Sequence, residues 1–160
     1  MTPAEKVVLY LSQYGLEKRI KTLDKSSETV ALAANALGCE AALIAKTLSF
    51  EVNGNAVLIV TAGDAKVENK KFKDFFGIKA KMLSPEQVEK LTGFIPGGVC
   101  PFAAKEGVKI YLDKSLQRFK TVYPAGGSGN TAVELSPSEL EYASQAESWI
   151  DVCKGWQDEK

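Results

Sequence analysis

Apolar and polar positions follow two different periods along the chain. Apolar side chains three or four residues apart predict several short helices. Many of these segments begin at Ser or Thr, often followed by Pro, and end at Gly, the residues that most often mark the two ends of a helix. The predicted helices cover residues 3–14, 27–37, 69–76 and 84–92, with a further helix beginning at Ser136-Pro137 and a short helical turn over 115–119.

Strand-like runs lie between these helices. The clearest pair is Ile44–Val52 and Ala56–Ala62, joined by Asn53-Gly54-Asn55 in the manner of a β-hairpin. Further strands are predicted over 19–24, 79–83, 109–113 and 121–123, and after Asn130. Strands scattered among helices predict an α+β fold, built on a sheet or a partly closed barrel with short flanking helices. We see no repeat and no linker, so we expect one domain over residues 1–160.

Composition excludes several classes of function. The chain has no histidine, and its three cysteines show no C-x-x-C spacing. The usual base of Ser-His and Cys-His hydrolases is therefore missing, and we expect neither a metal nor a cofactor. The formal charge is zero, so no broad basic field would hold DNA, and any contact with nucleic acid must be local. No segment has the pattern of a signal peptide or a membrane span, so we expect a cytoplasmic protein that does not contact membranes.

Lys46 stands at an unusual position for a lysine. Because side chains alternate between the two faces of a strand, Lys46 shares its face with Ile44, Leu48 and Phe50. An ammonium group on a core face is costly unless it is paired or opens on to a cavity. Two interpretations remain at this point. Lys46 lines a pocket and binds a phosphate or carboxylate, or its stem is buried while its ammonium group reaches water.

Two glycine-containing segments are candidates for backbone that approaches a ligand closely. Residues 97–102, Gly-Gly-Val-Cys-Pro-Phe, combine two flexible residues with a fixed proline. Residues 126–130, Gly-Gly-Ser-Gly-Asn, could present consecutive backbone N–H groups to an anion. The first segment could equally be a tight loop between elements, and the second could equally be a flexible hairpin loop. Neither matches a Walker loop or a dinucleotide-binding motif.

Three further features have weaker signals. Asp64 follows a strand and could deliver a carboxylate to a site or cap a turn. Cys100 could act as a nucleophile, although no histidine is present to activate it. A local run of positive charge could be a solvated helix face or a surface for a nucleic-acid backbone. It comprises Lys66, Lys70, Lys71, Lys73, Lys79 and Lys81.

Four segments together resemble the YbaK / prolyl-tRNA synthetase editing-domain family in order and spacing, over nearly the whole chain. They are Ile44-Ala45-Lys46-Thr47-Leu48, Gly63-Asp64, residues 97–102, and residues 125–130 ahead of Val133-Glu134-Leu135. The resemblance implies a mixed, partly closed β-barrel-like sheet flanked by short helices. It also implies trans-editing, the hydrolysis of mischarged tRNA, commonly tRNA(Pro) carrying alanine or cysteine.

The resemblance also assigns roles to individual residues. Lys46 corresponds to the family's characteristic lysine, which holds the tRNA 3′ end. The aminoacyl pocket would be lined by Gly97, Gly98, Val99, Cys100 and Pro101, of which the two glycines would serve catalysis. Asp64 would bind substrate, and Gly126, Gly127, Ser128 and Asn130 would close the pocket opposite the lysine. The chain has Ala125 and Ala132 where the Cys-tRNA(Pro) deacylases have serine and aspartate.

These observations predict a trans-editing hydrolase that positions the ester with Lys46 and loop amides, while water or a group of the substrate attacks. The expected partners are mischarged tRNA, with tRNA(Pro) carrying Ala, Cys or Ser as the first candidate, and prolyl-tRNA synthetase. Two alternatives remain. One is a non-catalytic module of the same fold that binds tRNA or a synthetase. The other is a small-molecule esterase or thioesterase that uses Cys100.

Overall fold

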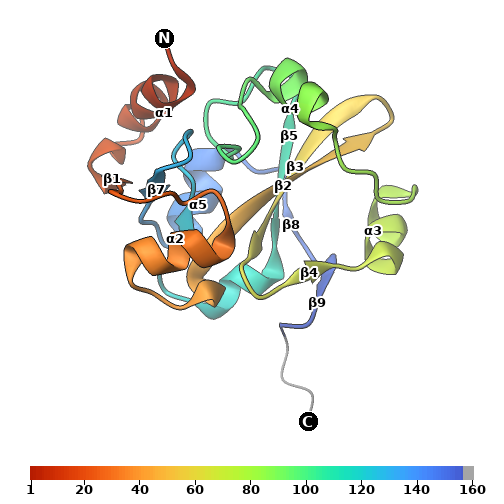
Figure 1. Ribbon diagram of the computed structural model, residues 1–160. Helices are drawn as coiled ribbons and strands as arrows, with labels where there is room; N and C mark the ends of the chain where they lie inside the picture. The colour runs from red at the N-terminus through yellow and green to blue at the C-terminus, as the bar shows by residue number, and fades with distance from the viewer. Residues whose placement is uncertain (157–160) are drawn as a thin grey trace.

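A five-stranded mixed sheet lies at the centre of the structure, a computed structural model that describes residues 1–156 (Figure 1). In spatial order its strands are β6 (Tyr123–Pro124), β2 (Ile44–Val52), β3 (Asn55–Ala62), β5 (Lys109–Asp113) and β8 (Trp149–Ile150). β2 and β3 are antiparallel, whereas β6, β5 and β8 each pair in parallel with their neighbour. The sheet and its short flanking helices confirm the predicted α+β class.

Two smaller sheets extend this arrangement. They are β1 (Ile20–Thr22) with β7 (Thr131–Val133), and β4 (Lys66–Val67) with β9 (Cys153–Lys154), both antiparallel. Isolated bridges join Val122 to Leu135 and Ala125 to Ala132. Backbone pairing therefore continues from β6 to β7 and on to β1, so the strands form a partly closed barrel.

The hairpin of β2 and β3 turns at Asn53 and Gly54, as predicted. Both residues have positive φ, 53° and 83°, the combination that suits the tight turn of a two-residue hairpin. The register pairs Lys46 with Thr61 and Phe50 with Val57. The centre of β3 is fully buried, with Leu58, Ile59 and Val60 at 0% exposure, so the hairpin is anchored in the core.

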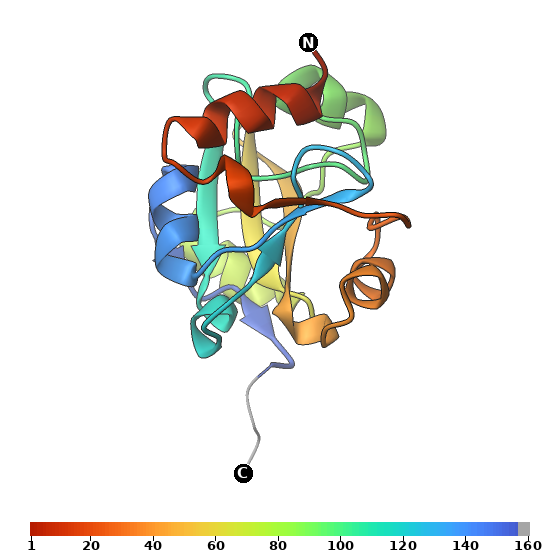
Figure 2. The ribbon, with the colours of Figure 1, turned by 90° about the vertical axis from the view of Figure 1, so that its left-hand side faces the viewer.

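Five α-helices and three short 3₁₀ helices are found in the described residues. They are α1 (Pro3–Ser12), α2 (Val30–Leu37), α3 (Asn69–Phe76), α4 (Pro85–Thr92) and α5 (Pro137–Ser144), with η1 (Glu17–Arg19), η2 (Ala41–Leu43) and η3 (Lys114–Arg118). Thr2, Ser84 and Ser136 each form a complete capping box at the start of a helix. Figures 1 and 2 show α1, α2 and α5 to one side of the sheet and α3 to the other. No helix in residues 1–156 is long and apolar enough to cross a membrane.

Several predicted boundaries were wrong, all at weak signals. Helix α1 ends at Ser12 and not at Tyr14, and Gly15 follows in a turn. Helix α2 is capped by Thr29 and not opened by Ser27, because the Thr29 hydroxyl accepts the hydrogen bond from Leu32 N. The strand predicted over 19–24 is shortened to β1 by η1. The strands predicted over 79–83 and 121–123 are reduced to a bridge at Met82 and to β6, which begins at Tyr123.

The outer edge of β2 is covered unevenly. At one end β6 pairs with Ile44 and Ala45. At the other end Glu51 N donates to Lys81 O, and Leu83 N donates to Ser49 O. Between them, no strand within the described residues pairs with this edge at 46–48. The gap leaves room for a ligand beside β2.

Candidate active site

A pocket of 260 Å³ lies along this uncovered edge of β2. Its wall combines residues 44–48 of β2 with the start of α2 and with loops from the second half of the chain. The lining residues are Ser27, Glu28, Thr29, Val30, Ala33, Ile44, Ala45, Lys46, Thr47, Leu48, Gly97, Val99, Tyr123, Ala125, Thr131 and Ala132. The pocket thus brings together residues about a hundred positions apart in sequence, among them three of the predicted site residues, Lys46, Gly97 and Val99.

Lys46 is half-buried in the pocket wall. Its Nζ donates a hydrogen bond to Ala65 O at 2.6 Å. Burial lowers the pKa of Lys46, and the nearby Cys153 and Asp64 only partly oppose that shift. An ammonium group has three N–H donors, and no second partner for Nζ is found within residues 1–156. Two donors therefore remain for a ligand.

Two hydroxyl groups in the pocket wall are also free. Ser27 Oγ and Thr47 Oγ1 are buried, and neither has a hydrogen-bond partner among the described residues. A buried polar group without a partner costs about 1–3 kcal/mol. A polar ligand in the pocket would remove that cost, so the wall is suited to a substrate that carries hydrogen-bonding groups.

The first glycine segment reaches the pocket at alternate residues. Gly98 N donates to Ile95 O at 3.0 Å, and Gly97 has φ of 90°, which gives a turn with Pro96 and Gly97 at its centre. Gly97 and Val99 line the pocket, whereas Gly98 does not. A Cβ on Gly98 would lie 3.2 Å from Ser128 Cα, so Gly98 allows the two glycine segments to pack together.

Cys100 and Pro101 face away from the pocket. Cys100 is fully buried, its Sγ donates to Phe102 O at 3.5 Å, and burial raises the pKa of its thiol to about 12. Pro101 is buried and lines a different surface depression, beside Tyr10. A thiol that stays protonated and enclosed at neutral pH is a poor nucleophile, so the geometry disfavours an esterase that uses Cys100.

The second glycine segment lies behind the pocket wall. Gly126, Gly127, Ser128 and Asn130 are not among the lining residues. The amide of Gly126 is engaged with Thr131 O. A Cβ on Gly127 would lie 2.8 Å from a methyl group of Val7, so the glycine lets the segment pack tightly against α1.

This segment instead holds the loop that precedes α2. Leu23 N donates to Asn130 O, and Ser27 N donates to Gly129 O, both at 2.7 Å. A Cβ on Gly129 would lie 2.8 Å from the Glu28 side chain. The segment therefore positions Ser27 and Glu28 in the pocket without lining the pocket itself.

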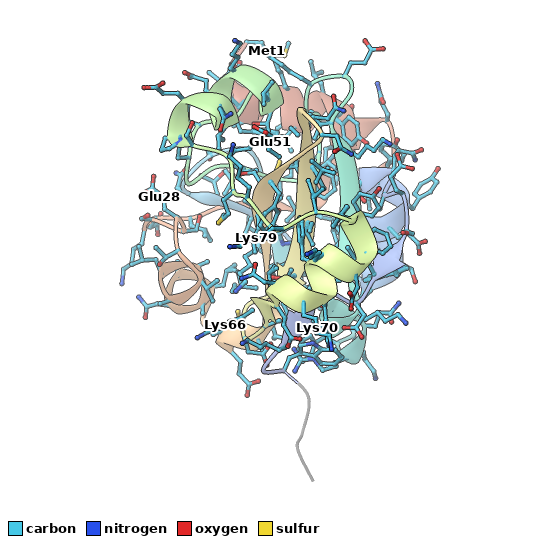
Figure 3. The ribbon with its side chains drawn as sticks, turned by 90° about the vertical axis from the view of Figure 1, so that its right-hand side faces the viewer. Met1, Glu28, Glu51, Lys66, Lys70 and Lys79 are labelled. Atoms are coloured by element: carbon cyan, nitrogen blue, oxygen red, sulfur yellow. The ribbon has the colours of Figure 1, made fainter. Side chains whose placement is uncertain are left out.

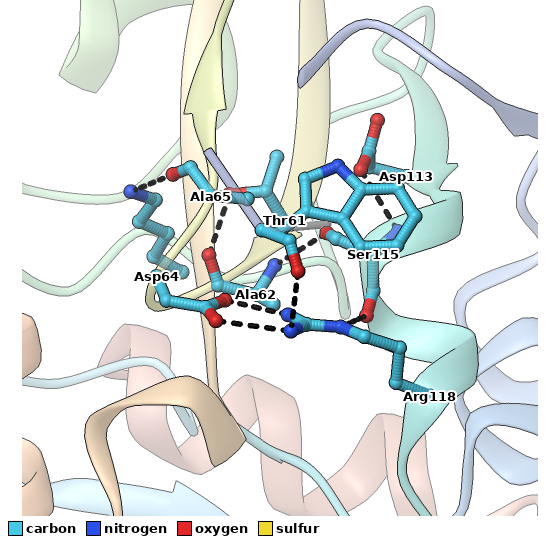
Figure 4. A network of polar contacts seen from close by, with 9 residues as sticks. Thr61, Ala62, Asp64, Ala65, Asp113, Ser115 and Arg118 are labelled. Atoms are coloured by element: carbon cyan, nitrogen blue, oxygen red, sulfur yellow. Dashed lines mark hydrogen bonds and ion pairs between the residues drawn. The ribbon is translucent and has the colours of Figure 1, made fainter. Parts of the chain in front are cut away.

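Asp64 is engaged in an ion pair outside the pocket wall. Its two carboxylate oxygens accept hydrogen bonds from Arg118 at 2.5 and 3.0 Å (Figure 4). The Arg118 guanidinium also lies over the rings of Phe119 and Trp156, at 4.6 and 5.0 Å from their centroids. The ion pair holds Asp64 in the turn that includes Ala65, whose carbonyl accepts the hydrogen bond from Lys46. The negative charge of Asp64 also raises the pKa of Lys46, which partly opposes the effect of burial.

Sequence reasoning missed Glu28, Thr29 and Tyr123. Glu28 lies at the pocket rim, where a Cβ on Gly97 would be 3.1 Å from its Oε1. The available signal was the polar run ahead of α2, which we interpreted as the start of the helix. Tyr123 belongs to a two-residue strand, and its phenol donates to Glu134 Oε1 at 3.1 Å. Nothing in its local sequence marks it as a pocket residue.

Ala125 and Ala132 form one wall of the pocket. They are joined by an isolated antiparallel bridge, and both line the pocket. At these two positions the resemblance predicts serine and aspartate. Their methyl groups make this side of the pocket apolar. Among residues 1–156 there is also no group of three or more Cys, Asp or Glu side chains that could hold a metal ion.

Comparison of the sequence with known proteins identifies the family to which this chain is similar. Residues 24–142 match the family model of the aminoacyl-tRNA editing domain. The chain is 49% identical to the uncharacterised protein YwhH of Bacillus subtilis, over 92% of this chain and 95% of that one. It is 31% identical to EbsC of Enterococcus faecalis, a candidate Cys-tRNA(Pro)/Cys-tRNA(Cys) deacylase, over 72% and 70%.

A solved structure gives the same result for the fold. It is described as a candidate trans-editing enzyme for prolyl tRNA synthetase, and it superposes with a TM-score of 0.86 at 30% identity, covering 97% of this chain and 99% of that one. The matched residues include every segment that lines the pocket. The chain therefore belongs to the aminoacyl-tRNA editing domain family.

Proposed function

We propose that this protein hydrolyses the ester bond of mischarged tRNA, and that its substrate is tRNA(Pro) carrying a small wrong amino acid, alanine, cysteine or serine. The observation that carries the proposal is the half-buried Lys46 with free donors, in a 260 Å³ pocket of an editing-domain chain. The names of its relatives support the reaction class. The apolar wall at Ala125 and Ala132 suits a small side chain.

Small amino acids are the expected targets for a physical reason. A synthetase pocket separates side chains that differ by one methylene by only about 1–3 kcal/mol, so smaller amino acids are attached in error. A second hydrolytic site then supplies the missing discrimination. Prolyl-tRNA synthetase is the proposed partner because the net charge of this chain is zero, so it has no broad basic field of its own to hold a whole tRNA.

The pocket supplies two kinds of group for this reaction. The Lys46 ammonium group binds the phosphate of the terminal nucleotide and fixes the 3′ end. Gly97 and Val99 line the pocket, and their amides have no backbone partner among the described residues. These amides stabilise the negative charge that develops on the carbonyl oxygen. The amides of Gly98 and Gly126 are already bonded to Ile95 O and Thr131 O, so they do not serve this role.

The chemical step is addition of water to the ester carbonyl carbon, followed by cleavage of the bond to the ribose oxygen. The ribose oxygen takes up the proton that the attacking water gives up, which restores the ribose hydroxyl, and the free amino acid leaves. With no histidine in the chain, catalysis relies on position and electrostatics.

Release of amino acid from Ala-, Cys- and Ser-tRNA(Pro), alongside correctly charged Pro-tRNA(Pro), tests the proposal. We expect the protein to hydrolyse at least one mischarged species and to leave Pro-tRNA(Pro) intact. If the protein binds these tRNAs but hydrolyses none, the non-catalytic binding module becomes the better description.

The proposal predicts a characteristic loss of affinity at alkaline pH. Burial lowers the pKa of Lys46, so the ammonium group loses its proton below the ordinary lysine value of about 10.4. Affinity for an amide-linked, non-hydrolysable analogue of 3′-alanyl-adenosine 5′-phosphate should therefore fall as pH rises towards 10. The measurement is a titration of the analogue at intervals from about pH 7.5 to 10.5. Lys46→Arg, which stays charged over this range, should bind the analogue without this fall, and the same fall in Lys46→Arg would assign it to another group.

Cys100 should be dispensable for the reaction. Because the thiol is buried, protonated and outside the pocket wall, Cys100→Ala should keep kcat/KM within about twofold, with a stability loss of roughly 1 kcal/mol for the missing sulfur atom. Deacylation rates and thermal unfolding of the variant give both numbers. A folded Cys100→Ala protein with a rate reduced by more than about tenfold would restore the thiol mechanism.

A further inference from the structure

A cluster of lysines adjoins the candidate active site. Within residues 66–81 there are six lysines and two carboxylates, a net charge of +4. The whole chain has 20 basic and 20 acidic residues, so the remainder has 14 and 18, a net charge of −4. The neutral total therefore hides a strongly polarised surface.

Five lysines in or beside this cluster are exposed and have no ion-pair partner among the described residues. Four of them belong to β4, α3 and β9, and we call these four the basic face: Lys66 on β4, Lys70 and Lys73 on α3, and Lys154 on β9. The fifth, Lys79, follows the end of α3. Two neighbouring lysines are neutralised, Lys71 by Asp151 at 3.1 Å and Lys81 by Glu51 at 3.8 Å. The basic face is thus left for an external anion.

The positions of these lysines are unfavourable in the isolated protein. Lys66 and Lys154 are direct partners across the antiparallel pair of β4 and β9, where like charges repel. Lys70 lies in the first turn of α3, where the helix dipole disfavours a cation and where no side chain caps the helix. An anionic partner would relieve both conflicts.

The basic face is connected directly to the candidate active site. Lys46 Nζ donates to Ala65 O, and Lys66 is the next residue along the chain. The charge of Lys66 contributes to lowering the pKa of Lys46, as expected for two lysines near one another. Figure 3 shows Lys66 and Lys70 on the side of the molecule where Lys79 also lies, with Glu28 of the pocket rim at its edge.

We propose that the basic face binds the phosphate backbone of the tRNA acceptor stem while the aminoacylated 3′ end occupies the pocket. This inference rests on the proposed function, since it assumes that the ligand in the pocket is the end of a tRNA. A duplex that leaves the pocket past Ala65 meets Lys66 and Lys154 first and then α3. Lysines supply this kind of contact without reading base sequence, so the basic face adds affinity for tRNA and no amino-acid selectivity.

The test compares two variants with equal changes in charge. The first replaces Lys66, Lys70, Lys73 and Lys154 by Gln. The control replaces Lys6, Lys90, Lys109 and Lys120, which are exposed elsewhere on the surface, by Gln. For each protein we would measure Kd for uncharged tRNA as a function of salt, and the hydrolysis rate of an aminoacylated 3′-terminal trinucleotide, which lacks the stem.

We expect the basic-face variant to bind tRNA at least about tenfold more weakly at low salt, with a log Kd against log salt slope reduced by about 2–4. Its rate on the trinucleotide should match wild type, and the control should match wild type in both measurements. Equal losses in the two variants, or an unchanged slope in the basic-face variant, would overturn the proposal. If wild type releases no amino acid from Ala-, Cys- or Ser-tRNA(Pro) while the binding result holds, the basic face stands and the proposed function fails.

Discussion

Replacement of Lys46 by alanine should lower kcat/KM for a mischarged tRNA by about 10- to 100-fold, the range expected when a hydrogen bond to a charged group is lost. The loss follows from the position of Nζ, which is held in the pocket wall by Ala65 O and has donors left for a phosphate. Folding should be preserved, because the substitution removes a partly desolvated charge from the wall. Single-turnover deacylation gives the rate, and thermal unfolding gives the stability.

Two further variants separate the role of Lys46 from the effect of positive charge in general. Lys46→Arg retains the charge but differs in shape, so it should keep part of the activity. Lys120→Ala removes an exposed lysine that is absent from the pocket wall, and should be close to wild type. A Lys46→Ala protein as active as Lys120→Ala would remove Lys46 from the mechanism.

Replacement of Gly63 by alanine should strongly destabilise the protein next to the pocket. A Cβ there would lie 1.9 Å from Ala41 O and 2.9 Å from a methyl group of Val30, so backbone would have to move. We expect a loss of about 2–4 kcal/mol, which lowers Tm by roughly 5–15 °C in a chain of this size. Because Val30 lines the pocket and Gly63 precedes the turn at Ala65, activity should fall as well.

Gly54→Ala and Gly107→Ala are suitable controls for this variant. Both glycines have positive φ, but a Cβ at either would meet nothing within 4 Å. Each should therefore cost only the conformational penalty of about 1–2 kcal/mol. Thermal unfolding of the three variants measures the difference, and a Gly63→Ala protein as stable as these two would show that the contact with Ala41 relaxes easily.

The sequence predicted those elements whose signals are local. The capping boxes at Thr2, Ser84 and Ser136 place three helices, and Asn53-Gly54 fixes the hairpin, because each motif is read within a few residues. Strands of two residues, such as β8 and β9, have no period to detect, and they form because β5 and β4 offer partners far away in sequence. Helix α2 was predicted to begin at Ser27, but its cap is Thr29, because a run of hydroxyl-bearing residues does not show from the sequence which one caps the helix.

The candidate site was predicted where one residue conflicts with its surroundings. Lys46 on an apolar strand face is such a conflict, and the structure places it in a pocket wall. Asp64 shows the opposite case, since its partner Arg118 is 54 positions away and a sequence pattern cannot show the pair. Cys100 and Gly126 belong to segments that pack close to the pocket, but whether a loop residue faces a cavity depends on its neighbours in space.

Turnover is the most direct test of the central claim, that the pocket at Lys46 hydrolyses mischarged tRNA. The measurement is the release of amino acid from mischarged tRNA(Pro) present in large molar excess over the protein, with the spontaneous loss in buffer subtracted. The account predicts that each protein molecule releases many amino acids from at least one of the Ala-, Cys- or Ser-charged species, and that Lys46→Ala lowers this rate. Release that never exceeds the buffer rate for any of the three would contradict it.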